Sequence, residues 1–301
     1  MDRSAVEDWI REHVSPVGAI EAAHERPWST VLRVPLAGEV AWFKACSAVQ
    51  AFEPRLTAQL YSRSANLIPE VLGYDEKRAW LLLADAGTNI GAIGNPPESW
   101  LAVLPVYAEL QRGEAAHARD HLAHGVPDMQ VETLPALYQD LLRHDLPLER
   151  DEVEQLRGFA PSFERLCAEL AARGIPASIQ HDDLHMNNVY VKDGRMRVLD
   201  WGDSSISHPF ASLVCTFRFL EERNGLAPGD SWFARLRDAY LEPWGTDLTD
   251  TFGLAMRVGA VAHAIAEVRQ RSALTGRERD DFDTDFATRL RRALAIAVPG
   301  A

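Results

Sequence analysis

Cysteine is scarce in this sequence. Only three occur in 301 residues, Cys46, Cys167 and Cys215, and long stretches of chain separate them. A disulfide framework or a structural zinc site needs more cysteines at closer spacing, so the sequence excludes both. We expect each cysteine to behave as a small buried apolar side chain.

Long uncharged runs are also missing. The longest covers residues 204–217 and includes a histidine and a proline, whereas a membrane-spanning helix needs about 20 apolar residues. The first residues, MDRSAVEDWIREH, are charged and lack the apolar stretch of a signal peptide. We therefore expect a cytoplasmic protein with no membrane partner.

Positive charge is in deficit. The chain has 31 Lys+Arg against 44 Asp+Glu, a formal net charge of −13. Binding of nucleic-acid phosphates needs clustered Lys and Arg, so we expect no nucleic-acid partner. Acidity serves solubility in many proteins, and it mildly favours a cationic ligand. The content of 47% hydrophobic and 25% charged residues is that of a globular protein of one large or two smaller domains.

The first 85 residues combine strand-like and helical patterns. Residues 51–63 place Phe52, Leu56 and Leu60 on one face of a predicted helix. Segments rich in β-branched, aromatic or other apolar residues predict strands at 30–36, 40–45, 70–74 and 80–84. These residues predict a small antiparallel sheet with one helix packed against it.

Helices dominate the rest of the chain. A Gly- and Pro-rich segment, residues 86–97, predicts a connector, and we divide the chain into residues 1–85 and 86–301 there. Residues 124–149 hold three prolines and predict a mixed insertion, and we expect Pro105 to kink the first of the helices. The predicted helices cover residues 98–118, 150–173, 249–272 and 277–298. The whole pattern predicts an α+β protein.

One short segment contains the candidate catalytic and metal-binding residues. In His181-Asp-Asp-Leu-His-Met-Asn-Asn188, four residues separate Asp183 from Asn188. Strand-like residues 188–192 and 196–199 flank Asp193-Gly194, a dipeptide typical of a hairpin turn, and Asp200 follows directly. The hairpin doubles the chain back, so we expect Asn188 and Asp200 to lie close together.

These residue types suit phosphoryl transfer. Amide and carboxylate oxygens at the mouth of one hairpin are the ligands that Mg²⁺ prefers, with waters and phosphates completing its shell. Asp183, on the loop just before the hairpin, is placed to orient and deprotonate a hydroxyl. One base, one asparagine on the metal and one aspartate on the metal is the division of labour in kinases.

Two segments resemble a known family. HDDLHMNNVYV and VLDWGDSSISHP are similar to the catalytic and metal-binding motifs of the aminoglycoside phosphotransferase and choline kinase-like family. The resemblance implies a bilobal protein-kinase-like fold and transfer of the γ-phosphate of ATP, with Mg²⁺, to a hydroxyl of a small-molecule acceptor. It also implies that Asp183 is the catalytic residue and that Asn188 and Asp200 are the metal ligands.

The chain departs from the family pattern at two positions. Asp182 stands where the family usually has glycine, which puts a second carboxylate beside the expected base and can alter its pKa. Ser212, three residues after Pro209, stands where the family commonly has aspartate, which can remove a buried ion pair. By the same resemblance His181 supports the loop backbone, while His185 either contacts substrate or packs the loop.

We expect the residues that bind the phosphates of the nucleotide in the first 85 residues. Lys44 lies near the end of a predicted strand among apolar neighbours, and we predict that it binds the α- and β-phosphates. Glu53, in the first turn of the next helix, is its predicted partner, with Glu70 as the alternative. The chain lacks a G-x-G-x-x-G loop, so Ser29 and Thr30 are the expected phosphate-loop donors.

The adenine contact is expected from the resemblance alone. Residues 82–87, Leu-Leu-Ala-Asp-Ala-Gly, end a predicted strand and begin the connector. By resemblance this is the hinge, whose backbone at Ala84 and Ala86 hydrogen-bonds the base.

The sequence indicates less clearly which residues bind the acceptor. His263 and Glu267 share a helix face, and we favour core packing or a surface pair over a role in the site. The aromatic side chains of Trp201, Trp232 and Trp244 are expected in the core. An acidic run near the last helix predicts a solvated helix start, made of Asp280, Asp281, Asp283 and Asp285.

Two other functions stay open at the level of sequence. One is a nucleotide-binding regulator of the same fold without turnover. The other is a hydrolase or metalloprotein that uses His181, Asp183 and His185 as zinc ligands. The sequence leaves the identity of the acceptor and the oligomeric state open.

Overall fold

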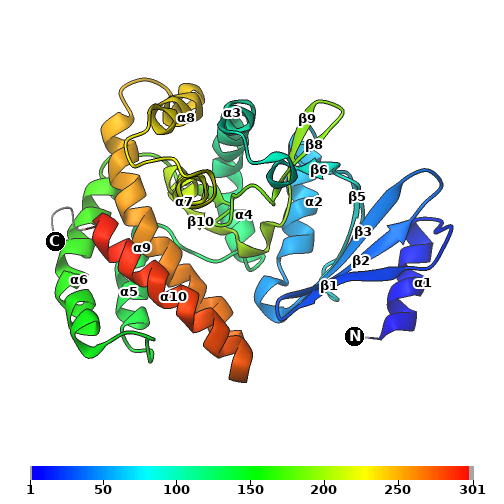
Figure 1. The fold of residues 1–301 in the computed structure, drawn as a ribbon, viewed down its shortest axis with the longest axis horizontal. Helices are drawn as coiled ribbons and strands as arrows, with labels where there is room; N and C mark the ends of the chain where they lie inside the picture. The colour runs from blue at the N-terminus through cyan, green and yellow to red at the C-terminus, as the bar shows by residue number, and fades with distance from the viewer. Residues whose placement is uncertain (1, 298–301) are drawn as a thin grey trace.

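A five-stranded antiparallel sheet forms the N-terminal lobe of the computed structural model, which describes residues 2–297 (Figure 1). Its strands lie in the order β1-β2-β3-β5-β4, with every neighbouring pair antiparallel. Their bounds are β1 Glu21–Arg26, β2 Ser29–Pro35, β3 Val40–Cys46, β4 Val71–Asp75 and β5 Trp80–Ala84. The predicted boundary after residue 85 falls just beyond β5.

Two helices accompany the sheet. Helix α1 (Arg3–His13) buries Val6, Trp9 and Ile10 in a small core with apolar residues of β2, β3 and β5. Helix α2 (Glu53–Arg63) lies between the sheet and the helices of the other lobe (Figure 1), and its apolar face joins the larger core. The prediction of four strands and one helix was incomplete, because it missed β1 and α1.

Both missed elements have polar sequences. All six residues of β1 are exposed, so the strand shows no apolar alternation. Helix α1 is mostly charged and shows only three buried side chains. Each element forms because a neighbour pairs with it or covers it, which a local pattern does not reveal.

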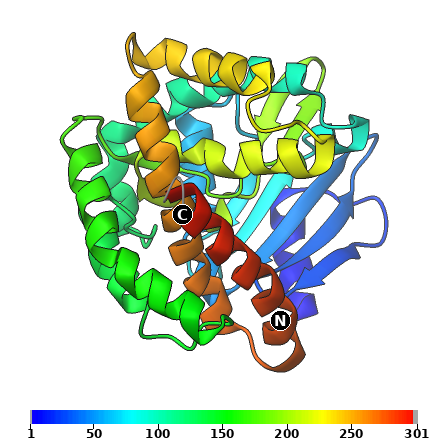
Figure 2. The same cartoon turned by 60° about the vertical axis from the view of Figure 1, so that its left-hand side comes forward.

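The C-terminal lobe is helical, as predicted. Its helices are α3 Pro97–Glu114, α4 Ala118–Ala123, α5 Leu134–Leu141, α6 Arg150–Ala171, α7 Leu213–Asn224, α8 Ser231–Leu241, α9 Thr249–Ala273 and α10 Gly276–Ala297. Helix α3 continues through Pro105 and ends at Glu114, four residues before its predicted end. Figure 2 shows α10 lying against α9, with the green helices of this lobe on the side of that pair that faces away from the N-terminal sheet.

Helix α9 is the central helix of this lobe. Among the described residues it is the one helix long and apolar enough to cross a membrane by length and composition. Within its most apolar window 61% of the residues are buried inside the protein. Helices α3, α7 and α10 contribute to the same apolar core, so this burial is that of a core helix.

Three short strands form a sheet beside the site. They are β6 (Thr88–Asn89), β8 (Val189–Lys192) and β9 (Arg195–Val198). The predicted Asp-Gly turn joins β8 to β9, with φ of 52° at Asp193 and 72° at Gly194, the left-handed conformation that such a turn requires. Leu199 N donates to Asn188 O at 2.9 Å, so the hairpin brings its two ends together as predicted.

The contact between α9 and α10 includes a largely buried ion pair. Arg271 donates from Nε and Nη2 to the two carboxylate oxygens of Asp283 at 2.5 and 2.8 Å, and 5% of the arginine side chain is exposed. The expected solvated acidic run is therefore wrong for Asp283, because the returning helix places that carboxylate against a buried guanidinium. The expectation holds for Asp281, which is exposed.

We expect Asp283→Ala to lower the free energy of unfolding by about 2–4 kcal/mol, because it leaves the buried Arg271 charge without its partner. Asp281→Ala is the matched control: its exposed pair with Arg277 spans 3.8 Å, and its loss should cost less than about 0.5 kcal/mol. Guanidinium denaturation of both variants measures the difference. Equal effects would contradict a structural role for the Asp283 pair.

Candidate active site

The loop that carries Asp183 runs from β7 (Ser178–Gln180) to β8, and a histidine holds its backbone. His181 donates from Nε2 to the carbonyl oxygen of Leu199 at 2.8 Å, and its Nδ1 accepts from Asp183 N at 3.3 Å. Burial lowers the pKa of His181, which keeps the ring neutral in this tautomer. The predicted supporting contacts are present, and both ring nitrogens are occupied, so His181 is not a metal ligand.

Asp183 lies at the end of this loop with its carboxylate held by neighbours. Its Oδ2 accepts from Asn188 Nδ2 at 3.1 Å and lies 3.2 Å from His185 Nε2. Burial by itself raises the pKa of Asp183, but the His185 hydrogen bond and the nearby histidines outweigh it and leave the pKa below its usual range. Asp183 is therefore ionised at neutral pH. The His185 ring also packs on Phe219, with centroids 4.5 Å apart.

Lys44 joins the two lobes. Its Nζ lies 2.6 Å from Glu53 Oε2, in α2, and 2.5 Å from Asp200 Oδ1, after β9. Burial lowers the pKa of Lys44, but the charges of Asp200 and Glu53 outweigh it and hold the pKa well above the usual value. The predicted pairing with Glu53 is present, and the alternative, Glu70, is exposed.

Asn188 and Asp200 offer oxygens where the sequence predicts a metal. The amide nitrogen of Asn188 donates to Asp183 O at 2.9 Å as well as to its carboxylate, which turns Oδ1 away from Asp183. Asp200 has φ of 65°, and 48% of its side chain is exposed. One amide oxygen and one accessible carboxylate form a donor set that fits Mg²⁺. The described residues contain no group of three or more His, Cys, Asp and Glu side chains that could hold a metal.

Asp203 belongs to the same site, although the sequence analysis passed over it. It accepts from Gln50 Nε2 at 2.9 Å and from Gln270, side chains that come from both lobes. Burial first, then the charges of Asp183 and Asp200, raise its pKa to about 7. A Cβ atom at Gly202 would lie 2.6 Å from the side chain of Gln50 and 2.8 Å from Glu53 Oε2, so a larger residue would displace both side chains from their present partners. The only local signal was a second aspartate in Asp200-Trp-Gly-Asp203.

The two departures from the family pattern have structural consequences. Asp182 has φ of 61°, a conformation in which glycine is free of strain. Its buried carboxylate accepts from Ser205 Oγ at 2.5 Å and from Gln180. Burial raises the pKa of Asp182 to about 6. The second carboxylate is thus fixed by its own hydrogen-bond donors.

Ser212 takes part in a buried network without charge. Its Oγ lies 3.0 Å from Tyr107 Oη and accepts from Gln111 Nε2 at 3.0 Å. Tyr107 Oη in turn accepts from His181 N at 3.1 Å. Neutral hydrogen bonds therefore support the loop that carries Asp183, at the position where an aspartate would need a buried cation.

The predicted nucleotide contacts have defined places. Ser29 and Thr30 begin β2 and lie opposite Cys46 and Ala45 of β3, directly after Trp28, whose side chain lines the cavity. Ala84 N donates to Glu70 O at 2.9 Å within the sheet, and Ala86 is buried in the connector. Their roles toward a nucleotide stay predictions.

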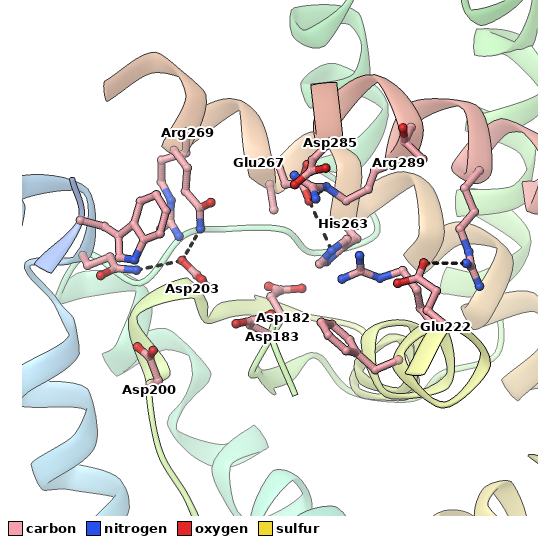
Figure 3. A pocket seen from close by; sticks show the side chains of 18 of the residues that line it. Asp182, Asp183, Asp200, Asp203, Glu222, His263, Glu267, Arg269, Asp285 and Arg289 are labelled. Carbon is pink, nitrogen blue, oxygen red and sulfur yellow. Dashed lines mark hydrogen bonds and ion pairs between the residues drawn. The ribbon is translucent and has the colours of Figure 1, made fainter. Parts of the chain in front are cut away.

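A cavity of about 500 Å³ opens beside Asp183. In Figure 3, Asp182 and Asp183 face His263 of α9 across it. His263 Nε2 lies 3.5 Å from Glu267 Oε1, so the two residues do pair, but the pair lines this cavity and is largely buried, whereas we favoured a place away from the site. The ionisable lining residues are Asp182, Asp183, Asp200, Asp203, Arg218, Glu222, Arg223, His263, Glu267, Arg269, Asp285, Arg289 and Arg292.

Comparison with known proteins agrees with this geometry. Residues 23–251 match the model of a family described as "Phosphotransferase enzyme family". No curated protein sequence matches the chain.

Solved structures share the fold. The choline kinase of Streptococcus pneumoniae aligns with a TM-score of 0.63 at 13% identity, covering 97% of this chain and 99% of that one. A choline/ethanolamine kinase family protein from Mesorhizobium loti aligns at 0.64 and 15%, covering 97% and 95%. The GDP complex of aminoglycoside 2'-phosphotransferase-IIIa aligns at 0.65 and 16%, covering 98% and 99%. The predicted bilobal, protein-kinase-like fold is confirmed.

The buried Asp182 predicts a pH-dependent stability. Its pKa rises from an ordinary 3.8 to about 6 on folding. The contribution of Asp182 to the free energy of unfolding is therefore fully present below pH 3.8. It falls by about 3 kcal/mol as the pH rises through 6. We expect Asp182→Asn to gain stability relative to wild type between pH 4 and pH 7, measured by urea denaturation. Asp193 is exposed and also has positive φ, so Asp193→Asn should show the same pH dependence of stability as wild type. If the stability of Asp182→Asn changed with pH in parallel with that of wild type, the raised pKa of Asp182 would be contradicted.

Proposed function

The chain belongs to the phosphotransferase enzyme family, and on that premise we propose that it transfers the γ-phosphate of ATP to a hydroxyl of a small molecule. Choline, ethanolamine and aminoglycosides appear in the names of its structural neighbours, which supports the small-molecule class of acceptor. One of the neighbours described above is a GDP complex, so the turnover assays compare ATP with GTP.

The observation that carries this proposal is the convergence of five side chains from distant parts of the chain. Lys44 contacts Glu53 and Asp200 within 2.6 Å, and Asn188 donates to Asp183. A kinase needs a cation for the α- and β-phosphates, oxygen ligands for the metal and a carboxylate at the acceptor hydroxyl. These five side chains supply all three.

Each group has a distinct task in the proposed reaction. Asp183, ionised and held by Asn188 and His185, orients the acceptor hydroxyl and accepts its proton as the oxygen attacks phosphorus. Lys44 keeps its charge and binds the α- and β-phosphates, while Glu53 fixes its position. Asn188 and Asp200 would hold Mg²⁺, which neutralises phosphate charge when bound.

Two alternatives are less well supported. A regulator without turnover has no use for an ionised carboxylate at Asp183, yet its hydrogen bonds maintain that state. A zinc hydrolase would need His181, whose ring nitrogens are both engaged. We also propose a cytoplasmic location and no nucleic-acid or membrane partner, on the charge and hydropathy of the sequence.

We expect Asp183→Asn to lower kcat by about 10²–10⁴-fold, because asparagine cannot accept the proton. Nucleotide affinity should stay within about twofold of wild type. Coupled ADP release over a panel of amino alcohols, sugars, aminoglycosides and macrolides measures turnover with ATP and GTP. Asp145→Asn, an exposed aspartate, is the control. Wild-type turnover by Asp183→Asn would remove Asp183 as the base, and nucleotide binding by wild type without any transfer would favour the regulator.

Replacement of Asp200 should act on nucleotide binding through the metal. Because Asp200 has φ of 65°, Asp200→Asn keeps the backbone conformation and removes the charge. We expect the Mg²⁺-dependent part of nucleotide affinity to fall by about tenfold or more, measured by calorimetry with Mg²⁺ and with a chelator. Asp247→Asn, exposed and at φ of 60°, should bind as wild type does. An unchanged Mg²⁺ dependence in Asp200→Asn would refute the ligand assignment.

A further inference from the structure

Most carboxylates around the cavity already have partners. Glu222 lies 3.1 Å from Arg292, and Glu267 is paired with Arg289. Asp200 is paired with Lys44, while Asp182 and Asp203 accept hydrogen bonds from hydroxyl and amide donors. Asp183 is held by Asn188 and His185, and among the described lining residues Asp285, exposed on α10, is the carboxylate without such a partner. The negative charge that a ligand meets without a paired cation is therefore mainly that of Asp183 and Asp285.

Arg218 of α7 is the opposite case. Its contacts are Cys215 Sγ, 3.8 Å from Nη2, and the ring of Phe219, 4.8 Å from the guanidinium carbon. Within residues 2–297 no carboxylate oxygen lies within 4.0 Å of its guanidinium nitrogens, the limit for an ion pair. Its Nε is buried and has no hydrogen-bond partner. The cavity thus holds a partly buried cation that forms no ion pair, although the charges of Glu222 and Glu267 act on it from a greater distance and help to raise its pKa.

Arg218 also lies beside the reacting end of the site. Cys215 Sγ lies 3.7 Å from Asp183 Oδ1, and Phe219 packs on His185, which contacts the same carboxylate. Lys44 contacts Asp200 on the hairpin side, whereas the contacts of Arg218 all lie on α7. Arg218 is therefore on the acceptor side of Asp183.

The chemistry of a guanidinium decides what fits there. Its planar set of donors matches the two oxygens of a carboxylate or a phosphate. A partly buried charge without a partner is unfavourable, and an anion removes that cost. Burial holds the pKa of His263 at about 3, so this neighbouring ring is neutral and adds no charge. A cationic group placed against α7 would meet the positive charge of Arg218.

We propose that Arg218 binds an anionic group of the acceptor, so the acceptor is a hydroxyl compound that also carries a carboxylate or a phosphate. This inference rests on the proposed phosphotransfer and specifies its substrate class. It reverses the mild preference for a cationic acceptor that the net charge of −13 suggested, because the overall charge is spread over the surface whereas the group beside Asp183 is positive.

Matched acceptor pairs test the proposal. L-Serine differs from ethanolamine by a carboxylate, glucuronate differs from glucose by a carboxylate, and glucose 6-phosphate differs from glucose by a phosphate. The carboxylate and phosphate arms therefore separate the two possible anions. Binding of each compound to the protein with MgADP is measured by calorimetry, and turnover with MgATP is measured by ADP release. We expect the anionic member of at least one pair to bind at least tenfold more tightly than its match.

Arg218→Gln should abolish that tenfold preference while leaving the affinity for MgADP within twofold. Arg218→Glu should favour the neutral or cationic member. Arg235→Gln is the matched control, because Arg235 also stacks on an aromatic ring, Trp232 at 3.8 Å, and does not line the cavity. It should keep the preference of wild type.

The other outcomes overturn the inference in distinguishable ways. If wild type binds neither anionic member more tightly, or if Arg218→Gln keeps the preference, the acceptor inference fails while phosphotransfer stands. If Arg218→Gln instead weakens MgADP binding, or lowers kcat equally for every acceptor, Arg218 serves the nucleotide or the transferred phosphate. If wild type binds no nucleotide, the proposed function itself fails, and the inference fails with it.

Discussion

The arrangement of the site depends on one lysine that contacts two carboxylates from different lobes. Lys44 comes from the sheet, Glu53 from α2 and Asp200 from the end of the β8–β9 hairpin. Opposite charges at about 2.5 Å in a buried place attract strongly, but burying them without all partners is unfavourable. The contacts of Lys44 with Glu53 and Asp200 therefore make the position of this charge depend on how the two lobes are arranged. Gly202 permits this approach, because any side chain there would collide with Gln50 and Glu53.

The catalytic loop is held in a different way, by neutral hydrogen bonds. His181, Tyr107 and Ser212 form a continuous buried path from the loop backbone to the start of α7. Gln111 extends this path to Tyr240, whose hydroxyl donates to Gln111 Oε1 at 2.6 Å. Because these groups are neutral, the network supports the loop without burying an additional ion beside Asp183. The pKa of Asp183 then depends on burial and on the nearby histidines.

Charge inside the cavity is distributed differently from charge over the whole chain. A formal net charge of −13 describes mostly exposed groups that solvent and salt screen. Inside the cavity, pairing and protonation reduce the negative charge: burial raises the pKa of Glu267 to about 7, although Arg289 opposes the rise. The local charge that a ligand would meet beside Asp183 is therefore set by a few groups. One of them, Arg218, forms no ion pair with a described carboxylate.

The sequence by itself determined the central sheet strands, the long helices, the Asp-Gly hairpin and the set of Lys44, Asp183, Asn188 and Asp200. Those features depend on local spacing: apolar periodicity, turn residues and a motif confined to about 20 residues. Only the tertiary structure decided that β1 and α1 form, that Asp203 joins the site and that His263, Glu267 and Arg218 line the cavity. The physical reason is that pairing, burial and charge compensation depend on residues far apart in the chain, and no local pattern records which distant side chain becomes a neighbour.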